Sequence, residues 1–137
     1  MALILDAGPL FASLDRNDSY HIASRDLIQR TDERLVIPAP VLPEVDYLIS
    51  SRLHPGILVS LLRDIDAGAF QVAELEAGDY PRILELCEQY ADSDIGFVDA
   101  AVLAIVERFN EPKLATLDHR HFGILRPRHV ESLTLVP

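Results

Sequence analysis

Two patterns of apolar residues alternate along the chain, short continuous runs and longer stretches with helical spacing. The runs at 2–5, 35–37, 70–75, 114–117 and 133–136 predict short buried strands. Helical spacing predicts helices over 10–15, 19–29, 41–52, 55–68, 79–91 and 97–109. Strands that alternate with helices favour a parallel sheet, here of about four to five strands, with helices on both faces. The sequence therefore predicts an α/β fold.

The length of 137 residues suits one domain, and no repeat, low-complexity tract or linker divides it. No apolar stretch approaches the length that spans a bilayer, and the first residues lack the basic segment of a signal peptide. The single cysteine, Cys87, cannot form an intramolecular disulfide. We therefore expect one domain over residues 1–137 that is cytoplasmic and not inserted in a membrane.

Four acidic residues are predicted at one edge of this sheet. Asp6 follows the first strand, and Asp118 follows the fourth. Glu44 and Asp99 lie in the first turns of helices, at the edge where parallel strands end. Topology alone thus brings four acids to one edge, although it does not place them in one pocket. Each also has a structural interpretation, as a helix cap, a turn former or a charge that stabilises a helix N-terminus.

Adjacent carboxylates repel one another unless a cation holds them together. Ligation by oxygen alone suits Mg²⁺ or Mn²⁺, whereas zinc prefers nitrogen and sulfur. A metal ion at such a site can activate water and stabilise the charge that builds on a phosphoryl group. The acids therefore favour hydrolysis of a phosphodiester.

The segments around these acids resemble the four motifs of the VapC family of PIN-domain toxins. They are Leu3-Ile4-Leu5-Asp6, Pro43-Glu44-Val45-Asp46-Tyr47-Leu48, Ile95-Gly96-Phe97-Val98-Asp99-Ala100-Ala101 and Ala115-Thr116-Leu117-Asp118-His119-Arg120-His121-Phe122. The resemblance implies a PIN-domain fold, Mg²⁺-dependent endonucleolytic cleavage of structured RNA, a homodimer, and neutralisation by a VapB-type antitoxin of a type II toxin–antitoxin pair. The family often has Thr, Ser or Asn after the first aspartate, where this chain has Ala7 and Gly8. Ser13 or Thr116 is the predicted substitute.

The four acids are expected to divide the work. Asp6 and Asp99 are short side chains on rigid elements, so we predict that they ligate the metal directly. Glu44 has a longer reach and is predicted to orient or deprotonate the attacking water. Asp118, expected in a mobile turn, is predicted to complete a weaker second metal position or to hold a water.

Charge is distributed unevenly along the chain, whose net charge is -10. Residues 1–109 contain 19 acids and 8 bases, whereas residues 110–137 contain 3 acids and 4 bases. An acidic protein repels nucleic acid at long range, so local cations must support an RNA substrate. Arg120, Arg126 and Arg128 are the predicted RNA contacts, with solvated surface as the alternative interpretation.

Other polar residues near the motifs have simpler interpretations. His119, His121 and His129 have the composition of a metal cluster, but they lack a cysteine or a second pair at zinc spacing. His119, beside Asp118, is a better candidate for substrate contact. Asp46 is predicted to be structural or related to the dimer, and Asp94 to cap a helix.

Competing functions differ in the acids that they require. A haloacid-type phosphatase needs a second aspartate two residues after the first, where this chain has Gly8. A phosphoryl receiver needs a lysine after a late strand, whereas the only lysine, Lys113, precedes its strand. A catalytically inactive PIN-type module that binds RNA or protein remains the alternative. For the antitoxin, apolar positions over 45–49 and 58–65 predict a groove that accepts a helix, and a basic segment is expected to cross the acidic site.

Overall fold

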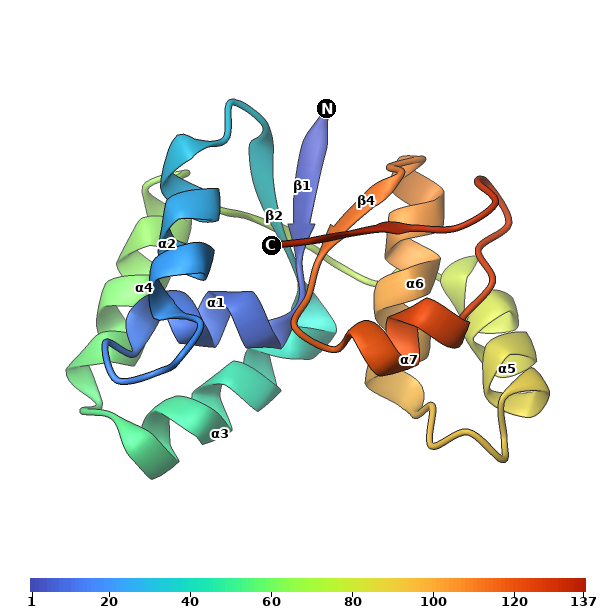
Figure 1. The fold of residues 1–137 in the computed structure, drawn as a ribbon, viewed down its shortest axis with the longest axis horizontal. Helices are drawn as coiled ribbons and strands as arrows, with labels where there is room; N and C mark the ends of the chain where they lie inside the picture. Colours follow the sequence, from blue (N-terminus) through green and yellow to red (C-terminus); the bar gives the residue numbers. More distant parts are fainter.

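The computed structural model describes all residues from Met1 to Pro137 (Figure 1). Five strands form one sheet: β1 (Ala2–Leu5), β2 (Arg34–Pro38), β3 (Gln71–Ala73), β4 (Lys113–Ala115) and β5 (Thr134–Val136). The helices are α1 (Ala7–Leu14), α2 (His21–Arg30), the 3₁₀ turn η1 (Ala39–Val41), α3 (Leu42–Arg52), α4 (Gly56–Asp66), α5 (Asp79–Gln89), α6 (Phe97–Phe109) and α7 (His119–Ile124). The predicted α/β architecture is confirmed.

All neighbouring strands are parallel, in the order β3-β2-β1-β4-β5. Figure 1 shows α1 to α4 on one side of the central strands and α5 to α7 on the other. From β1 the chain builds outwards through β2 to β3, then crosses back and places β4 on the free side of β1. The direction of winding therefore changes between β1 and β4, and this is the point where open parallel sheets form their ligand sites.

The core is built from residues that the sequence marks as continuous apolar runs. All four residues of β1 are fully buried, because this strand lies at the centre of the sheet with helices on both faces. Helix α6 is buried from Ala100 to Val106, and its three alanines give it a small, closely packing surface. The rigid centre of the fold thus holds the end of β1 and the start of α6, the two places that carry Asp6 and Asp99. No helix combines the length and the apolar character needed to cross a membrane.

The structure differs from the prediction at the end of β4, at Asp118 and at the start of α1. Strand β4 ends at Ala115 instead of Leu117, so Asp118 comes three residues after the strand and not directly after it. Asp118 then begins α7, where a turn was predicted; the buried side chains of Phe122 and Leu125 anchor this short helix. Helix α1 begins at Ala7, three residues earlier than predicted.

Candidate active site

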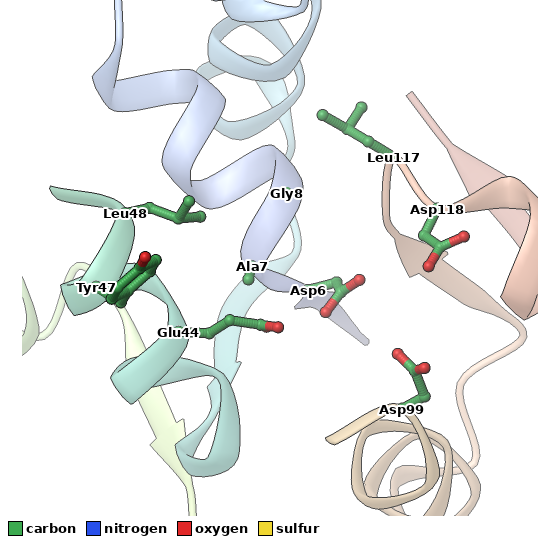
Figure 2. A pocket seen from close by; sticks show the side chains of 9 residues that line it. All are labelled: Asp6, Ala7, Gly8, Glu44, Tyr47, Leu48, Asp99, Leu117 and Asp118. Atoms are coloured by element: carbon green, nitrogen blue, oxygen red, sulfur yellow. The ribbon is translucent and has the colours of Figure 1, made fainter. Parts of the chain in front are cut away.

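One cleft at the carboxyl edge of β1 and β4 contains all four predicted acids (Figure 2). Its volume is about 630 Å³, and it is lined by Asp6, Ala7, Gly8, Glu44, Tyr47, Leu48, Asp99, Leu117 and Asp118. Figure 2 shows the carboxylates of Asp6, Asp99 and Asp118 around a common space, with Glu44 reaching towards Asp6 from α3. The change of winding between β1 and β4 explains why acids on one edge also share one pocket.

Asp6 is the most buried of the four, with 8% of its surface exposed. It stands at the N-cap position of α1, but its side chain makes no capping hydrogen bond. Its Oδ2 instead accepts a hydrogen bond of 2.8 Å from the hydroxyl of Thr116. Burial raises the pKa of Asp6 to about 6, against the effect of the Thr116 bond and with help from the charges of Glu44 and Asp99. The carboxylate is therefore aimed at the cleft and not used to cap the helix.

Thr116 connects two of the acids. Its buried hydroxyl donates to Asp6 and accepts a 3.0 Å bond from the backbone N–H of Asp118. Ser13 and Thr116 were the two predicted substitutes for the family's polar residue, and Thr116 is the one that hydrogen-bonds to Asp6. The hydroxyl of Ser13 instead donates to the carbonyl oxygen of Leu10 within its own helix.

Asp118 is fixed by its own helix. Its Oδ1 accepts the backbone N–H of His121 at 3.0 Å, and its Oδ2 is 2.6 Å from Nδ1 of the same residue. Because a carboxylate only accepts, the Nδ1 atom of His121 carries the proton. The prediction that Asp118 occupies a mobile turn is therefore wrong. Asp118 caps α7, because its carboxylate accepts a hydrogen bond from the backbone N–H of the third helical residue, as N-cap residues do.

Glu44 and Asp99 have no such fastening. Both lie in the first turns of their helices, as predicted, and neither accepts a hydrogen bond from another side chain. Burial and the charge of Asp99 raise the pKa of Glu44. Burial and the charge of Asp118 raise the pKa of Asp99, which His121 and the backbone N–H of Gly96 partly oppose. Burial is thus the main cause of the raised pKa values of these three acids, and the charges of neighbouring carboxylates add to it.

The chemistry of these donors fits a hard divalent cation that keeps part of its water shell. The cleft offers carboxylate oxygens and no histidine or thiol among its lining residues. No group of three or more His, Cys, Asp or Glu side chains forms a ready-made metal site anywhere in the chain. Mg²⁺, which binds through one or two carboxylates and several waters, suits this open arrangement. A zinc site from the three histidines does not form, because each ring contacts a different partner.

Several residues that line the cleft were not predicted from the sequence as part of the site. Tyr47 and Leu48 lie one helical turn after Glu44, so their place in the cleft follows from helical spacing. Leu117 lies between β4 and Asp118, and it comes close to Gly8. A Cβ atom at Gly8 would lie 3.2 Å from the Cβ of Leu117, so the missing side chain at position 8 lets α1 approach this wall.

The predicted arginines lie outside the cleft lining. Arg120 is exposed on α7, two residues after Asp118. Arg126 is exposed beyond α7. The guanidinium of Arg128 contacts Glu85 at 2.5 Å, and its backbone N–H donates to Glu107. Asp46 and Asp94 are exposed and do not line the cleft either.

Known proteins share both the sequence and the fold. The model of the PIN domain matches residues 3–124. Ribonuclease VapC26 of Mycobacterium tuberculosis is 30% identical over 135 residues, which cover 98% of this chain and 100% of the relative.

Solved structures extend this likeness at lower identity, where they establish the fold alone. VapC20 of Mycobacterium tuberculosis, a toxin that cleaves the sarcin–ricin loop, has a TM-score of 0.78 at 17% identity, covering 94% of this chain and 98% of that one. A chain of VapBC2 from Rickettsia felis, solved with a promoter DNA fragment, has a TM-score of 0.72 at 18% identity and 100% coverage of both. FitAcB of Neisseria gonorrhoeae has a TM-score of 0.65 at 14% identity, covering 100% and 97%. The predicted resemblance is thereby confirmed, and this chain belongs to the PIN-domain family, among its VapC-type ribonucleases.

Proposed function

We propose that this protein is a metal-dependent endoribonuclease and the toxin of a VapBC-type toxin–antitoxin pair. The observation that carries the proposal is the cleft in which Asp6, Glu44, Asp99 and Asp118 meet from four separate elements. The VapC-type relative and the toxin structures of the same fold support RNA as the substrate. An acidic cleft of this kind needs a cation before it can accept a phosphodiester.

In this proposal Asp6 and Asp99 hold Mg²⁺, or Mn²⁺, because they flank the cleft from rigid elements. A cation held by these residues would lower the pKa of a water molecule and neutralise charge on the phosphoryl group. Glu44 orients and deprotonates the attacking water, a role that its longer side chain and raised pKa favour. Asp118 holds a water or a second, weaker cation, since each of its hydrogen-bonded oxygens keeps a free lone pair.

Cations outside the cleft are proposed to hold the RNA backbone. Arg120 is the best placed, being exposed beside Asp118 and free of any ion pair. Arg126 is proposed as a second contact. Arg128 can contribute only by releasing Glu85. Replacing Arg120 by alanine is expected to weaken RNA binding across sequences and to flatten its salt dependence by about one unit of slope.

The proposed protein partner is a VapB-type antitoxin, with the toxin as a cytoplasmic homodimer. An apolar groove of about 330 Å³ between α3 and α4 is lined by Leu42, Pro43, Asp46, Leu58 and Leu62. It lies where a groove was predicted, but Val45 and Ile49 belong to the buried core and cannot line it. A helix of the antitoxin fits such a groove, and a basic segment with an arginine complements the carboxylates.

The test is cleavage of total and synthetic RNA by the purified protein in Mg²⁺, in Mn²⁺ and in EDTA. We expect internal cuts in Mg²⁺ that EDTA abolishes. A protein that binds RNA but never cuts it in either metal would instead be the inactive PIN-type module. Purification from the native host tests the partner, because a toxin recovered without a small basic protein contradicts it.

A further inference from the structure

A second hollow adjoins the catalytic cleft on the side of β4 and α2. Its volume is about 440 Å³, and it is lined by Tyr20, Ala23, Leu117, His119 and Pro137. Leu117 also lines the catalytic cleft, so one side chain separates the two spaces. A chain that lies over the carboxylates and continues towards α2 can therefore reach this hollow.

The side chains of the hollow present flat and apolar faces without an acid. Tyr20 is 55% exposed, so its ring is available to a ligand. His119 is exposed, and its Nε2 lies 3.1 Å from the carbonyl oxygen of Thr116, which holds the imidazole beside the active site. Aromatic and imidazole rings beside a small apolar wall are the surfaces on which proteins stack unpaired nucleobases.

The segments of the chain that supply the lining of the hollow are less acidic than the segment between them. All five lining residues belong to the segments 1–32 and 110–137, which together carry 8 acids and 7 bases. The intervening segment 33–109 carries 14 acids and 5 bases. Arg120 follows His119 directly and is exposed. The segments that supply the lining are therefore nearly balanced in charge, and their net charge repels a polyanion less than that of residues 33–109.

We propose that this hollow is a nucleobase subsite, in which Tyr20 and His119 stack one unpaired base of the RNA next to the bond that is cut. This proposal rests on the proposed ribonuclease function and adds a requirement to it, namely that the nucleotide beside the scissile phosphate leaves its helix. Because every base has a π-face, the subsite tolerates any base and selects for an unpaired one.

The first experiment measures binding and does not depend on cleavage. Asp99→Asn protein, with and without Tyr20→Ala, is titrated into labelled single-stranded RNA of about twelve nucleotides of mixed sequence and into a duplex of the same length. Loss of one stacking contact is expected to weaken single-strand binding about tenfold and to leave duplex binding unchanged. Tyr20→Phe keeps the ring and should bind as the parent does. Tyr80→Ala on α5 is the matched control, because Tyr80 is 52% exposed and remote from both hollows.

The second experiment places the base. An RNA that the protein cuts is made with one abasic nucleotide on either side of the scissile phosphate. If Tyr20 stacks on that base, removing the base and removing the ring each raise KM about tenfold, and the two losses do not add. The chain contains no tryptophan, so Tyr20→Trp also supplies a single tryptophan, whose fluorescence a stacked base should quench.

The outcomes separate the two proposals. If the parent never cuts RNA but Tyr20→Ala selectively loses single-strand binding, the ribonuclease function fails and the subsite stands. If the parent cuts RNA and Tyr20→Ala behaves as Tyr80→Ala in both assays, the subsite is overturned. Unchanged RNA binding together with loss of the copurifying antitoxin would assign the hollow to the protein partner, which also overturns it.

Discussion

The two halves of the active site are held in different ways. Asp6 directly follows β1, Asp118 caps α7 three residues after β4, and the hydroxyl of Thr116 joins them. His121 fastens both oxygens of Asp118 in addition. Glu44 and Asp99 come from the first turns of α3 and α6 and contact no other side chain through hydrogen bonds. The site thus has a fastened half, Asp6 and Asp118, and a free half, Glu44 and Asp99, around one cleft (Figure 2).

This difference indicates which part of the site a cation must organise. The fastened half is held by hydrogen bonds from Thr116 and His121, so we expect it to keep its shape without metal. In the free half, burial and the charge of Asp118 raise the pKa of Asp99. The four carboxylates do not form a ready-made metal site in this structure. Glu44 and Asp99, which no side-chain hydrogen bond holds, are therefore the acids whose position would depend most on a bound cation.

The largest effect is expected from Asp99→Asn, which removes a charge from the free half. The amide keeps the size of the side chain but cannot hold the cation. Cleavage should fall on the order of a thousandfold, since a catalytic metal contributes several kcal/mol to the transition state. Calorimetric titration should show a matching loss of Mg²⁺ affinity in a protein that still unfolds cooperatively.

Asp94→Asn is the matched control, because Asp94 is an exposed aspartate outside the cleft. Its backbone has φ of 57°, a conformation that asparagine adopts readily. This variant should cut RNA at the parent rate. Cleavage at the parent rate by Asp99→Asn instead would mean that the free half does not hold the cation.

The fastened half is tested by Thr116→Val, which keeps the shape and removes the hydroxyl. Asp6 then loses the bond that lowers its pKa, and the N–H of Asp118 loses its acceptor. Loss of such a supporting partner typically costs about 10-fold to 100-fold in metal affinity. The midpoint of the pH dependence of Mg²⁺ binding should also move upwards, which a general loss of stability would not cause. Thr116→Ser should restore both, and Ser13→Ala should change neither; a normal pH midpoint in Thr116→Val would remove Thr116 from the site.

How far the sequence predicts this contrast depends on the range of each interaction. Asp6 and the start of α6 were predicted correctly, because a buried strand and a long apolar helix are local patterns. Helix α7 was not predicted, because it has only six residues. Its two buried anchors, Phe122 within the helix and Leu125 directly after it, give little periodicity. The order of strands, and with it the shared cleft, depends on contacts between distant segments. The bond from Thr116 to Asp6 joins residues 110 positions apart, and it was named only as one of two options.

The pH dependence of stability gives a third test, through Asp6. Its pKa rises from 3.8 to about 6 on folding, so the folded protein binds a proton more tightly than the unfolded chain. The stabilisation is complete below about pH 4 and is lost as the pH rises through about 6, a change of at most about 3 kcal/mol. Metal-free protein should lose this stability between pH 4 and 7, whereas Asp6→Asn should not. Chemical unfolding of both proteins at several pH values measures the free energy of unfolding of each. If these free energies depend on pH in the same way in both proteins, burial does not raise the pKa of Asp6.

The smallest effect on metal binding is expected from Asp118→Asn, although Asp118 belongs to the fastened half. Asparagine can accept the backbone N–H of His121 through its oxygen and donate to Nδ1 through its amide, once the imidazole moves its proton to Nε2. Helix α7 therefore keeps its cap. Removing this charge also relieves Asp99, whose pKa Asp118 raises, so the lost attraction for the cation is partly offset. We expect Mg²⁺ affinity to fall only about threefold, while the cleavage rate falls further because the water or second cation is lost. Calorimetry beside single-turnover cleavage separates the two quantities. An affinity loss as large as that of Asp99→Asn would show that Asp118 ligates the same cation as Asp6 and Asp99, and its proposed role at a water or a second, weaker cation would be wrong.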